Sequence, residues 1–210
     1  SLHDALPIYY PVYYDRSFEV KVGLWQEGDW MPAVAVGIDD LVGTGVYGGE
    51  YVVASKQFGS VDAAVGAGWG RLGTANSVKN PFGAISPGFY QRGGTTGTGG
   101  NFNLREYFHG PTMGFFGGLD WRTPIDGLTL VAEISSDSYQ EERSSRNFEP
   151  RNQFNFGASY QVSDGVTLGL DWLYGRALGG NVSFQLDPTT DAFPQKIDSP
   201  PVIAPELRSD

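Results

Sequence analysis

The sequence has no cysteine and only two histidines among its 210 residues. The absence of cysteine excludes a disulfide framework and any metal site built on thiolates. Basic residues are also scarce: 14 lysines and arginines stand against 24 aspartates and glutamates, and the formal net charge is -10. Nucleic-acid binding needs a basic footprint, so we expect no nucleic-acid partner. No apolar run approaches the roughly 18 residues of a membrane-spanning helix, so none is predicted.

The sequence does contain 30 glycines, 14% aromatic residues and a repeated alternation of apolar and polar side chains. The alternation is clear over residues 20–24, 128–134, 153–160 and 167–172. A period of two residues is typical of a β-strand with two different faces. One face here is aliphatic or aromatic, and the other carries Glu, Lys, Asp, Gln, Asn, Ser or Gly.

The alternation predicts nine strands, joined in turn by a short connection and a longer one. Their expected bounds are 16–25, 32–38, 48–57, 61–71, 114–121, 128–135, 152–161, 166–174 and 181–187. This order of short turns and long loops is typical of outer-membrane barrels. The sequence therefore predicts an all-β fold, an antiparallel up-and-down transmembrane β-barrel segment of about nine strands. Because bacterial barrels have even strand counts, we expect it to be truncated, a fragment of a longer protein.

The two ends of the chain differ from its middle. Residues 1–8 have no initiator Met and no features of a signal peptide, and they resemble translated adapter sequence, so we expect a non-native leader. Residues 188–210 are rich in proline and polar residues, which predicts a linker. The outer-membrane β-barrel portion is then residues 9–187.

The tryptophans lie where two aromatic girdles of a membrane barrel would place them. Trp25 and Trp30 flank the first short turn, and Trp121 precedes a later one. Trp69 and Trp172 lie toward the opposite ends of their strands. Girdles of this kind mark the two membrane interfaces. The alternative is that these indoles cap the hydrophobic core of a soluble protein.

Several segments are informative when they are taken together in their order along the chain: Tyr14–Lys21, Pro32–Asp40, Gly43–Gly45, Gly49–Lys56, Gly66–Leu72, Phe108–Pro111, Phe116–Gly118, Thr123–Leu130 and Asn155–Gly157. In this order they resemble the YjbH-like outer-membrane proteins of exopolysaccharide biosynthesis. The resemblance implies a large outer-membrane β-barrel of a Gram-negative bacterium, tied to polysaccharide production and export. Its surroundings would be outer-membrane lipid, and its partners exopolysaccharide and other export proteins. The resemblance transfers no catalytic residue.

Charged residues within the alternating strands are the candidates for contact with polysaccharide in a lumen. They are Glu19, Lys21, Glu133 and Asp171. Charges at such positions would tune which molecules enter. The alternative is that the polar side chains pair with one another and fill a closed interior.

Catalysis is not expected. A metal site or a Ser-His-Asp triad would depend on His109, which lies in a Gly/Pro stretch typical of a loop. A glycosidase needs two carboxylates about 5–10 Å apart, and Glu50, Asp62, Glu133 and Asp171 all lie on expected polar faces. The sequence does not show which two would meet. We expect a non-catalytic pore or scaffold without cofactor or metal; the alternative is a soluble β-sandwich that binds carbohydrate.

Overall fold

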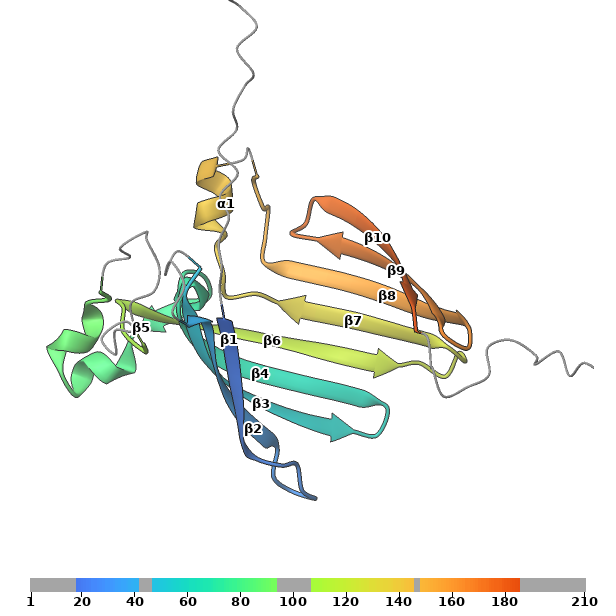
Figure 1. Cartoon of the computed structure of the whole chain (residues 1–210), viewed down its shortest axis with the longest axis horizontal. Coiled ribbons are helices and arrows are strands. Elements are labelled where there is room, and N and C mark those ends of the chain that lie inside the picture. Colours follow the sequence, from blue (N-terminus) through green and yellow to red (C-terminus); the bar gives the residue numbers. More distant parts are fainter. Residues whose placement is uncertain (1–17, 42–46, 94–106, 146–147, 186–210) are drawn as a thin grey trace, which may run out of the picture.

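The computed structural model describes residues 18–41, 47–93, 107–145 and 148–185 (Figure 1). The expected leader at residues 1–8 and the expected linker at 188–210 lie outside the described residues. Within the described ranges no helix is long and apolar enough to cross a membrane.

The molecule is built around one antiparallel sheet. Its strands follow the order β1-β2-β3-β4-β6-β7-β8-β9-β10, so each pairs with its neighbours in sequence. The strands are β1 (Phe18–Trp25), β2 (Ala33–Leu41), β3 (Gly49–Phe58), β4 (Val61–Gly70), β6 (Thr112–Arg122), β7 (Leu128–Ile134), β8 (Phe154–Ser163), β9 (Val166–Leu173) and β10 (Ala177–Phe184). A short strand, β5 (Ser77–Lys79), pairs with β6 outside this path. The predicted all-β, up-and-down architecture is confirmed.

The register gives the sheet an apolar face and a polar face. Leu130 lies opposite Ala158, and Phe156 lies opposite Trp172, with their rings stacked at 5.9 Å between centroids. On the other face Glu133 lies opposite Asn155. A slip of one residue would exchange the two faces, so the alternating pattern fixes the pairing.

The sheet curves but does not close. Strand direction turns progressively from β1 to β10 (Figure 1), as expected when right-handed twist accumulates across many strands. In the described residues β1 pairs only with β2, and β10 pairs only with β9. The first and last strands of the described sheet therefore have open edges, and a closed barrel is not observed.

The connections at the two ends of the strands differ in length. Residues 59–60, 123–127 and 164–165 make short turns at one end of the strands, which we call the short-turn edge. At the opposite edge, residues 71–111 contain β5 and the 3-10 helices η1 (Arg71–Gly73), η2 (Pro81–Ala84) and η3 (Pro87–Tyr90). Residues 135–153 contain the helix α1 (Gln140–Ser145) at that same edge.

The connection before the last strand is shorter than expected. The alternation predicted a strand over 181–187, but β10 begins at Ala177 and its partner strand ends at Leu173. The turn has positive φ at Tyr174 (57°) and Gly175 (67°), and the Arg176 N–H donates to the Leu173 carbonyl at 3.0 Å. Positive φ at both central residues is the backbone geometry of type I′ turns, which commonly connect the two strands of a β-hairpin.

The first long connection folds into a lobe, which we define as residues 71–92 and 107–111 and call the rim lobe. Its interior contains Trp69 of β4, whose ring stacks on Phe82 at 5.4 Å and meets Phe108 edge to face at 5.1 Å. Asn80 lies beneath these rings with 1% of its surface exposed. Its amide accepts from Trp69 Nε1 and from the Phe82 N–H, and donates to three carbonyls of the lobe.

Candidate functional site

The apolar face of the sheet is open to its surroundings. Many large side chains on this face are exposed, with exposed fractions from 37% at Leu130 to 76% at Leu178. Others on the face are Val20, Val22, Val65, Phe115, Leu119, Trp121, Phe154, Phe156, Tyr160, Leu168, Leu170, Trp172, Val182 and Phe184. Contiguous apolar surface spread over so many strands marks a surface for membrane or protein contact.

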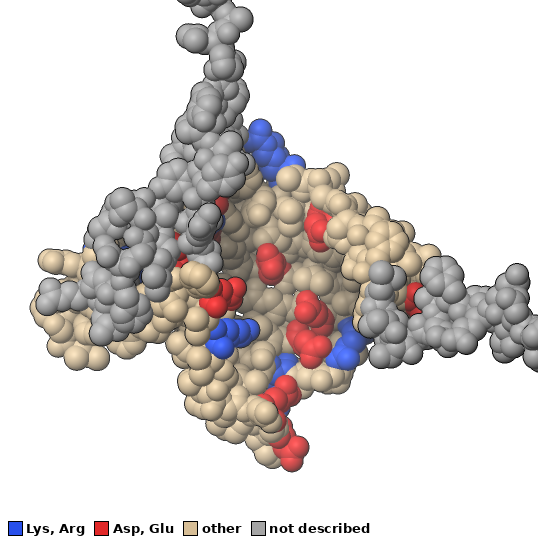
Figure 2. Space-filling view, in the orientation of Figure 1, with Lys and Arg blue, Asp and Glu red and all other residues tan. Residues whose placement is uncertain are grey.

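The opposite face is hollow and polar, and we call it the concave face. Figure 2 shows acidic and basic side chains gathered in the hollow. By register this face carries Glu19, Lys21, Asp39, Tyr51, Ser55, Asp62, Phe116, Asp120, Thr129, Glu133, Asn155, Ser159, Asp171 and Asn181. The predicted separation of apolar and polar faces is present.

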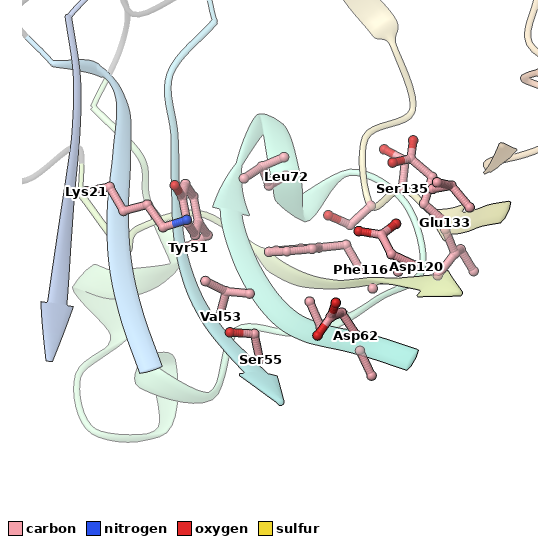
Figure 3. A pocket seen from close by; sticks show the side chains of 17 residues that line it. Lys21, Tyr51, Val53, Ser55, Asp62, Leu72, Phe116, Asp120, Glu133 and Ser135 are labelled. Carbon is pink, nitrogen blue, oxygen red and sulfur yellow. The ribbon is translucent and has the colours of Figure 1, made fainter. Parts of the chain in front are cut away.

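A pocket of about 590 Å³ lies in the concave face. It is bounded by side chains from β1, β3, β4, β6 and β7 and by the residues that follow β7. Its polar lining comprises Lys21, Tyr51, Ser55, Asp62, Asp120, Glu133, Ser135 and Ser136 (Figure 3). We take this pocket as the candidate site because it is the place where charged, hydroxyl and aromatic groups converge.

Two aromatic rings form the centre of the pocket. Tyr51 and Phe116 meet edge to face, with 6.1 Å between ring centroids. Each ring lies over a glycine of a neighbouring strand. A Cβ atom on Gly37 would be 2.1 Å from Tyr51 Cζ, and one on Gly66 would be 2.2 Å from Phe116 Cζ. The absence of side chains at the two glycines therefore lets the rings lie against the sheet.

Carboxylates occupy one side of the pocket. Asp62 and Asp120 lie directly opposite each other on β4 and β6. Arg122 pairs with Asp62 at 3.1 Å, where both side chains are about half exposed. Glu133 accepts a hydrogen bond from Asn155 Nδ2 at 2.6 Å, and Asn155 Oδ1 in turn accepts from the Tyr174 N–H at 2.8 Å.

The predicted contact residues do not form one cluster. Lys21 and Glu133 line the pocket, and Glu19 lies beside it, accepting from the Tyr51 hydroxyl at 3.5 Å. Asp171 lies apart on β9, where its carboxylate accepts from Asn181 Nδ2 at 3.2 Å. Tyr51 and Phe116 were not predicted as site residues. Asp120 was also missed, although its place between Leu119 and Trp121 assigns it to the polar face by alternation.

The tryptophans differ in exposure, and one of the five is buried. Trp25, Trp30 and Trp121 are 49%, 92% and 42% exposed at the short-turn edge, and Trp172 is 41% exposed on the apolar face. Trp69 is only 4% exposed, because the rim lobe covers it. Trp69 is therefore a core residue of the lobe and has no place in an exposed girdle.

Glu50 is also displaced from its expected face. By register it shares the apolar face with Ile38 and Trp69, and it is fully buried beneath the rim lobe. Arg92 binds its two carboxylate oxygens at 2.7 and 2.9 Å, and the Phe108 N–H donates to it at 2.9 Å. These contacts make Glu50 a structural anchor of the lobe, on the opposite face of the sheet from the pocket.

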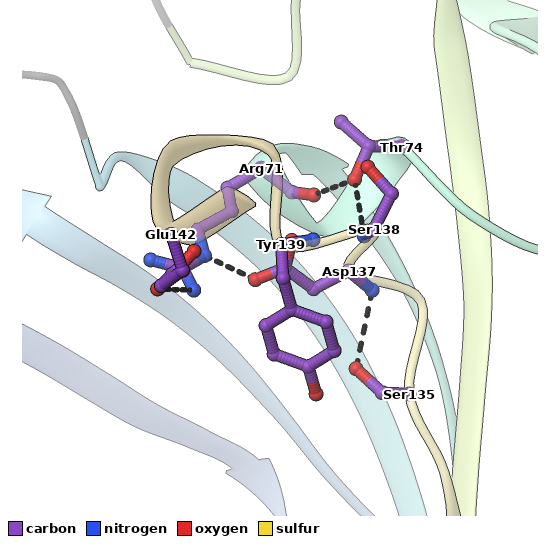
Figure 4. Close-up of polar contacts among 7 residues, drawn as sticks. All are labelled: Arg71, Thr74, Ser135, Asp137, Ser138, Tyr139 and Glu142. Atoms are coloured by element: carbon purple, nitrogen blue, oxygen red, sulfur yellow. Dashed lines mark hydrogen bonds and ion pairs between the residues drawn. The ribbon is translucent and has the colours of Figure 1, made fainter. Parts of the chain in front are cut away.

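A polar cluster, which we call the rim latch, joins the two long connections (Figure 4). Arg71 Nε pairs with Asp137, and Arg71 Nη2 pairs with Glu142 at 2.5 Å. The Ser138 N–H donates to Thr74 Oγ1 at 2.8 Å. Burial acts to lower the pKa of Arg71, but its hydrogen bonds and charge pairs with Asp137 and Glu142 outweigh burial and raise the pKa above its ordinary value. The guanidinium therefore stays charged and holds both loops.

His109 is a lobe residue. Its ring stacks on Phe89 at 4.3 Å between centroids, and its Nδ1 lies 2.6 Å from the Tyr107 carbonyl oxygen. In the part of the chain that the structure describes, no group of three His, Cys, Asp or Glu residues is placed to hold a metal ion.

Comparison with known proteins gives the family. The YjbH family, described as exopolysaccharide biosynthesis protein YbjH, matches residues 7–210. The chain belongs to this family. It is also 39% identical over 164 residues to a protein of Escherichia coli K12 named uncharacterized lipoprotein YjbH. The aligned part covers 78% of the chain and 23% of that relative, so the chain spans about a quarter of the relative's length. No solved structure matches the chain.

Proposed function

We propose that this chain forms part of the wall of an outer-membrane β-barrel in a Gram-negative bacterium. The observation that carries the proposal is the two-faced curved sheet, with an exposed apolar face and a hollow polar face. The core of a bilayer contains no water to hydrogen-bond with backbone N–H and C=O groups, so a lipid-facing sheet must pair these groups between its strands. The apolar face would meet lipid, and the concave face would line the interior.

The connections support an orientation for this wall. Short turns gather at one edge of the sheet, and the rim lobe and α1 lie at the other. In outer-membrane barrels the short turns face the periplasm and the long loops face outside. Trp25, Trp30 and Trp121 would then mark the periplasmic interface.

The role we propose is a non-catalytic pore or scaffold that assists exopolysaccharide biosynthesis or export. Membership of the YjbH family supports the link to exopolysaccharide. Two of the carboxylates on the concave face, Glu133 and Asp171, are bound by the amides of Asn155 and Asn181. Carboxylates of this kind accept hydrogen bonds from water and sugar hydroxyls, and they can tune passage without breaking bonds.

The alternative, a soluble β-sandwich that binds carbohydrate, needs a second layer over the apolar face. In the described residues no second sheet covers this face, and Phe156 and Leu170 remain 46% and 60% exposed. The apolar surface therefore favours the membrane wall.

The test is membrane fractionation of the protein at its natural length, combined with one substitution on each face. Leu170→Arg places a charge on the apolar face, where it should cost about 2–4 kcal/mol near the bilayer midplane and reduce insertion. Ser159→Arg places the same charge on the concave face and should leave insertion intact. Recovery of the wild-type protein as a soluble periplasmic species would refute the proposal, and equal insertion of both variants would refute the assignment of faces.

A further inference from the structure

We propose that the pocket binds sugar units that carry a free ammonium group, so that the glycan contacting this wall is an amino-sugar polymer and not a uronic-acid polymer. The inference rests on the proposed function, because it assumes that the concave face meets the glycan. It names the chemical class of that glycan from the lining of the pocket.

The aromatic centre of the pocket suits a sugar ring. Tyr51 and Phe116 present apolar ring surface beside the charged and hydroxyl groups of the lining, and Tyr51 adds a hydroxyl. Both rings are backed by strands where the glycines leave no competing side chain. The volume of about 590 Å³ lies within the range of small-molecule pockets, about 300–1,000 Å³.

The carboxylates that line the pocket favour a positively charged ligand. Like charges directly opposite on neighbouring strands destabilise a sheet, and Asp62 and Asp120 are such a pair. Arg122 compensates Asp62 only. Among the described residues the Asp120 carboxylate has no hydrogen-bond or ion-pair partner, and Glu133 adds a third negative charge to the same lining. A cationic ligand group would relieve this repulsion.

An ammonium group fits these acceptors better than a metal ion. It has three donors and needs only carboxylate or hydroxyl oxygens around it, which Asp62, Asp120 and Ser55 supply. Calcium needs about 6–8 oxygen ligands, and the described residues hold no group placed for a metal. Lys21, on the β1 side of the pocket, can donate to a hydroxyl or ring oxygen of the same glycan (Figure 3).

The experiment is calorimetric titration of the protein at its natural length in detergent micelles. The probes are a glucosamine tetramer, its fully N-acetylated counterpart and a galacturonate tetramer. We expect the glucosamine tetramer to bind most tightly, the acetylated tetramer less tightly, and the galacturonate tetramer not measurably. Asp120→Asn should raise the dissociation constant for glucosamine about tenfold, and Glu133→Gln should raise it less. Asp126→Asn, which removes the same charge in a short turn, should leave it unchanged.

Two results would overturn the inference: galacturonate binding as tightly as glucosamine, or unchanged glucosamine binding in both Asp120→Asn and Glu133→Gln. If Asp120→Asn does not fold, Glu133→Gln and the ranking of the three probes decide the matter. The outcome for the proposed function is separate. If the protein is soluble but still ranks the probes as expected, the membrane wall is refuted and amino-sugar binding by the pocket is supported. If the protein inserts but does not show this ranking, only amino-sugar binding by the pocket is refuted.

Discussion

The ring of Phe116 occupies the space above Gly66, where a Cβ atom would lie 2.2 Å from Phe116 Cζ. Substitution Gly66→Ala should therefore push this ring away from the sheet. Overpacking of this kind destabilises a protein by about 1–3 kcal/mol. Thermal unfolding in detergent should show the loss as a lower midpoint. Gly23→Ala is the matched control, because a Cβ atom there would meet nothing within 4 Å. Equal midpoints for the two variants would contradict the packing of Phe116.

Asn80 should be the most sensitive residue of the rim lobe. Asn80→Ala would leave the Trp69 indole N–H, the Phe82 N–H and two carbonyls of the lobe without this partner, while the third carbonyl, that of Phe89, also accepts from the Gly110 N–H. Buried groups left unsatisfied cost about 1–3 kcal/mol each, so we expect the lobe to open while the strands stay paired. Limited proteolysis should then cut within residues 71–111. Asn181→Ala, which removes a single exposed hydrogen bond, should leave the cleavage pattern unchanged.

Arg71 should couple the two long connections. Arg71→Gln removes both charge pairs of the rim latch, and we expect a loss of about 2 kcal/mol, since hydrogen bonds to charged groups contribute about 1.5–3 kcal/mol. Arg71→Lys should restore little, because an ammonium group lacks the planar fork that reaches Asp137 and Glu142 together.

The control for Arg71 is Arg176→Gln, which breaks an exposed pair with Glu149 at 3.7 Å. Exposed pairs contribute about 0–1 kcal/mol. Chemical unfolding of the three variants provides the comparison. If Arg71→Gln were no less stable than Arg176→Gln, the rim latch would not hold the loops together.

Much of the fold was predictable because a period of two residues encodes both a strand and its faces. The last hairpin was predicted with the wrong bounds because its turn uses Tyr174-Gly175 and its strand contains Gly179 and Gly180, which read as a loop. The identity of the two edge strands, β1 and β10, was predictable from the strand order alone, since an up-and-down meander leaves its first and last strands with one partner each.

The candidate site was only partly predictable. Alternation assigned Lys21 and Glu133 to the concave face correctly, but the pocket depends on which strands curve around it. Trp69 and Glu50 were misplaced because the rim lobe folds over the apolar face, and its contacts join residues far apart in the sequence. Local patterns do not encode such contacts.

The central claim is that the apolar face meets lipid, and spin labels on single cysteines measure this directly, since these 210 residues contain no cysteine of their own. Single cysteines would replace Leu119 and Leu170 on the apolar face, and Ser55 and Ser159 on the concave face, in the protein at its natural length with any cysteine outside these residues removed. Each would carry a spin label in reconstituted liposomes, where oxygen partitions into lipid and a nickel chelate stays in water. We expect Leu119 and Leu170 labels to be accessible to oxygen and shielded from nickel, with the reverse at Ser55 and Ser159. Equal access of the nickel chelate to both faces would contradict the membrane wall.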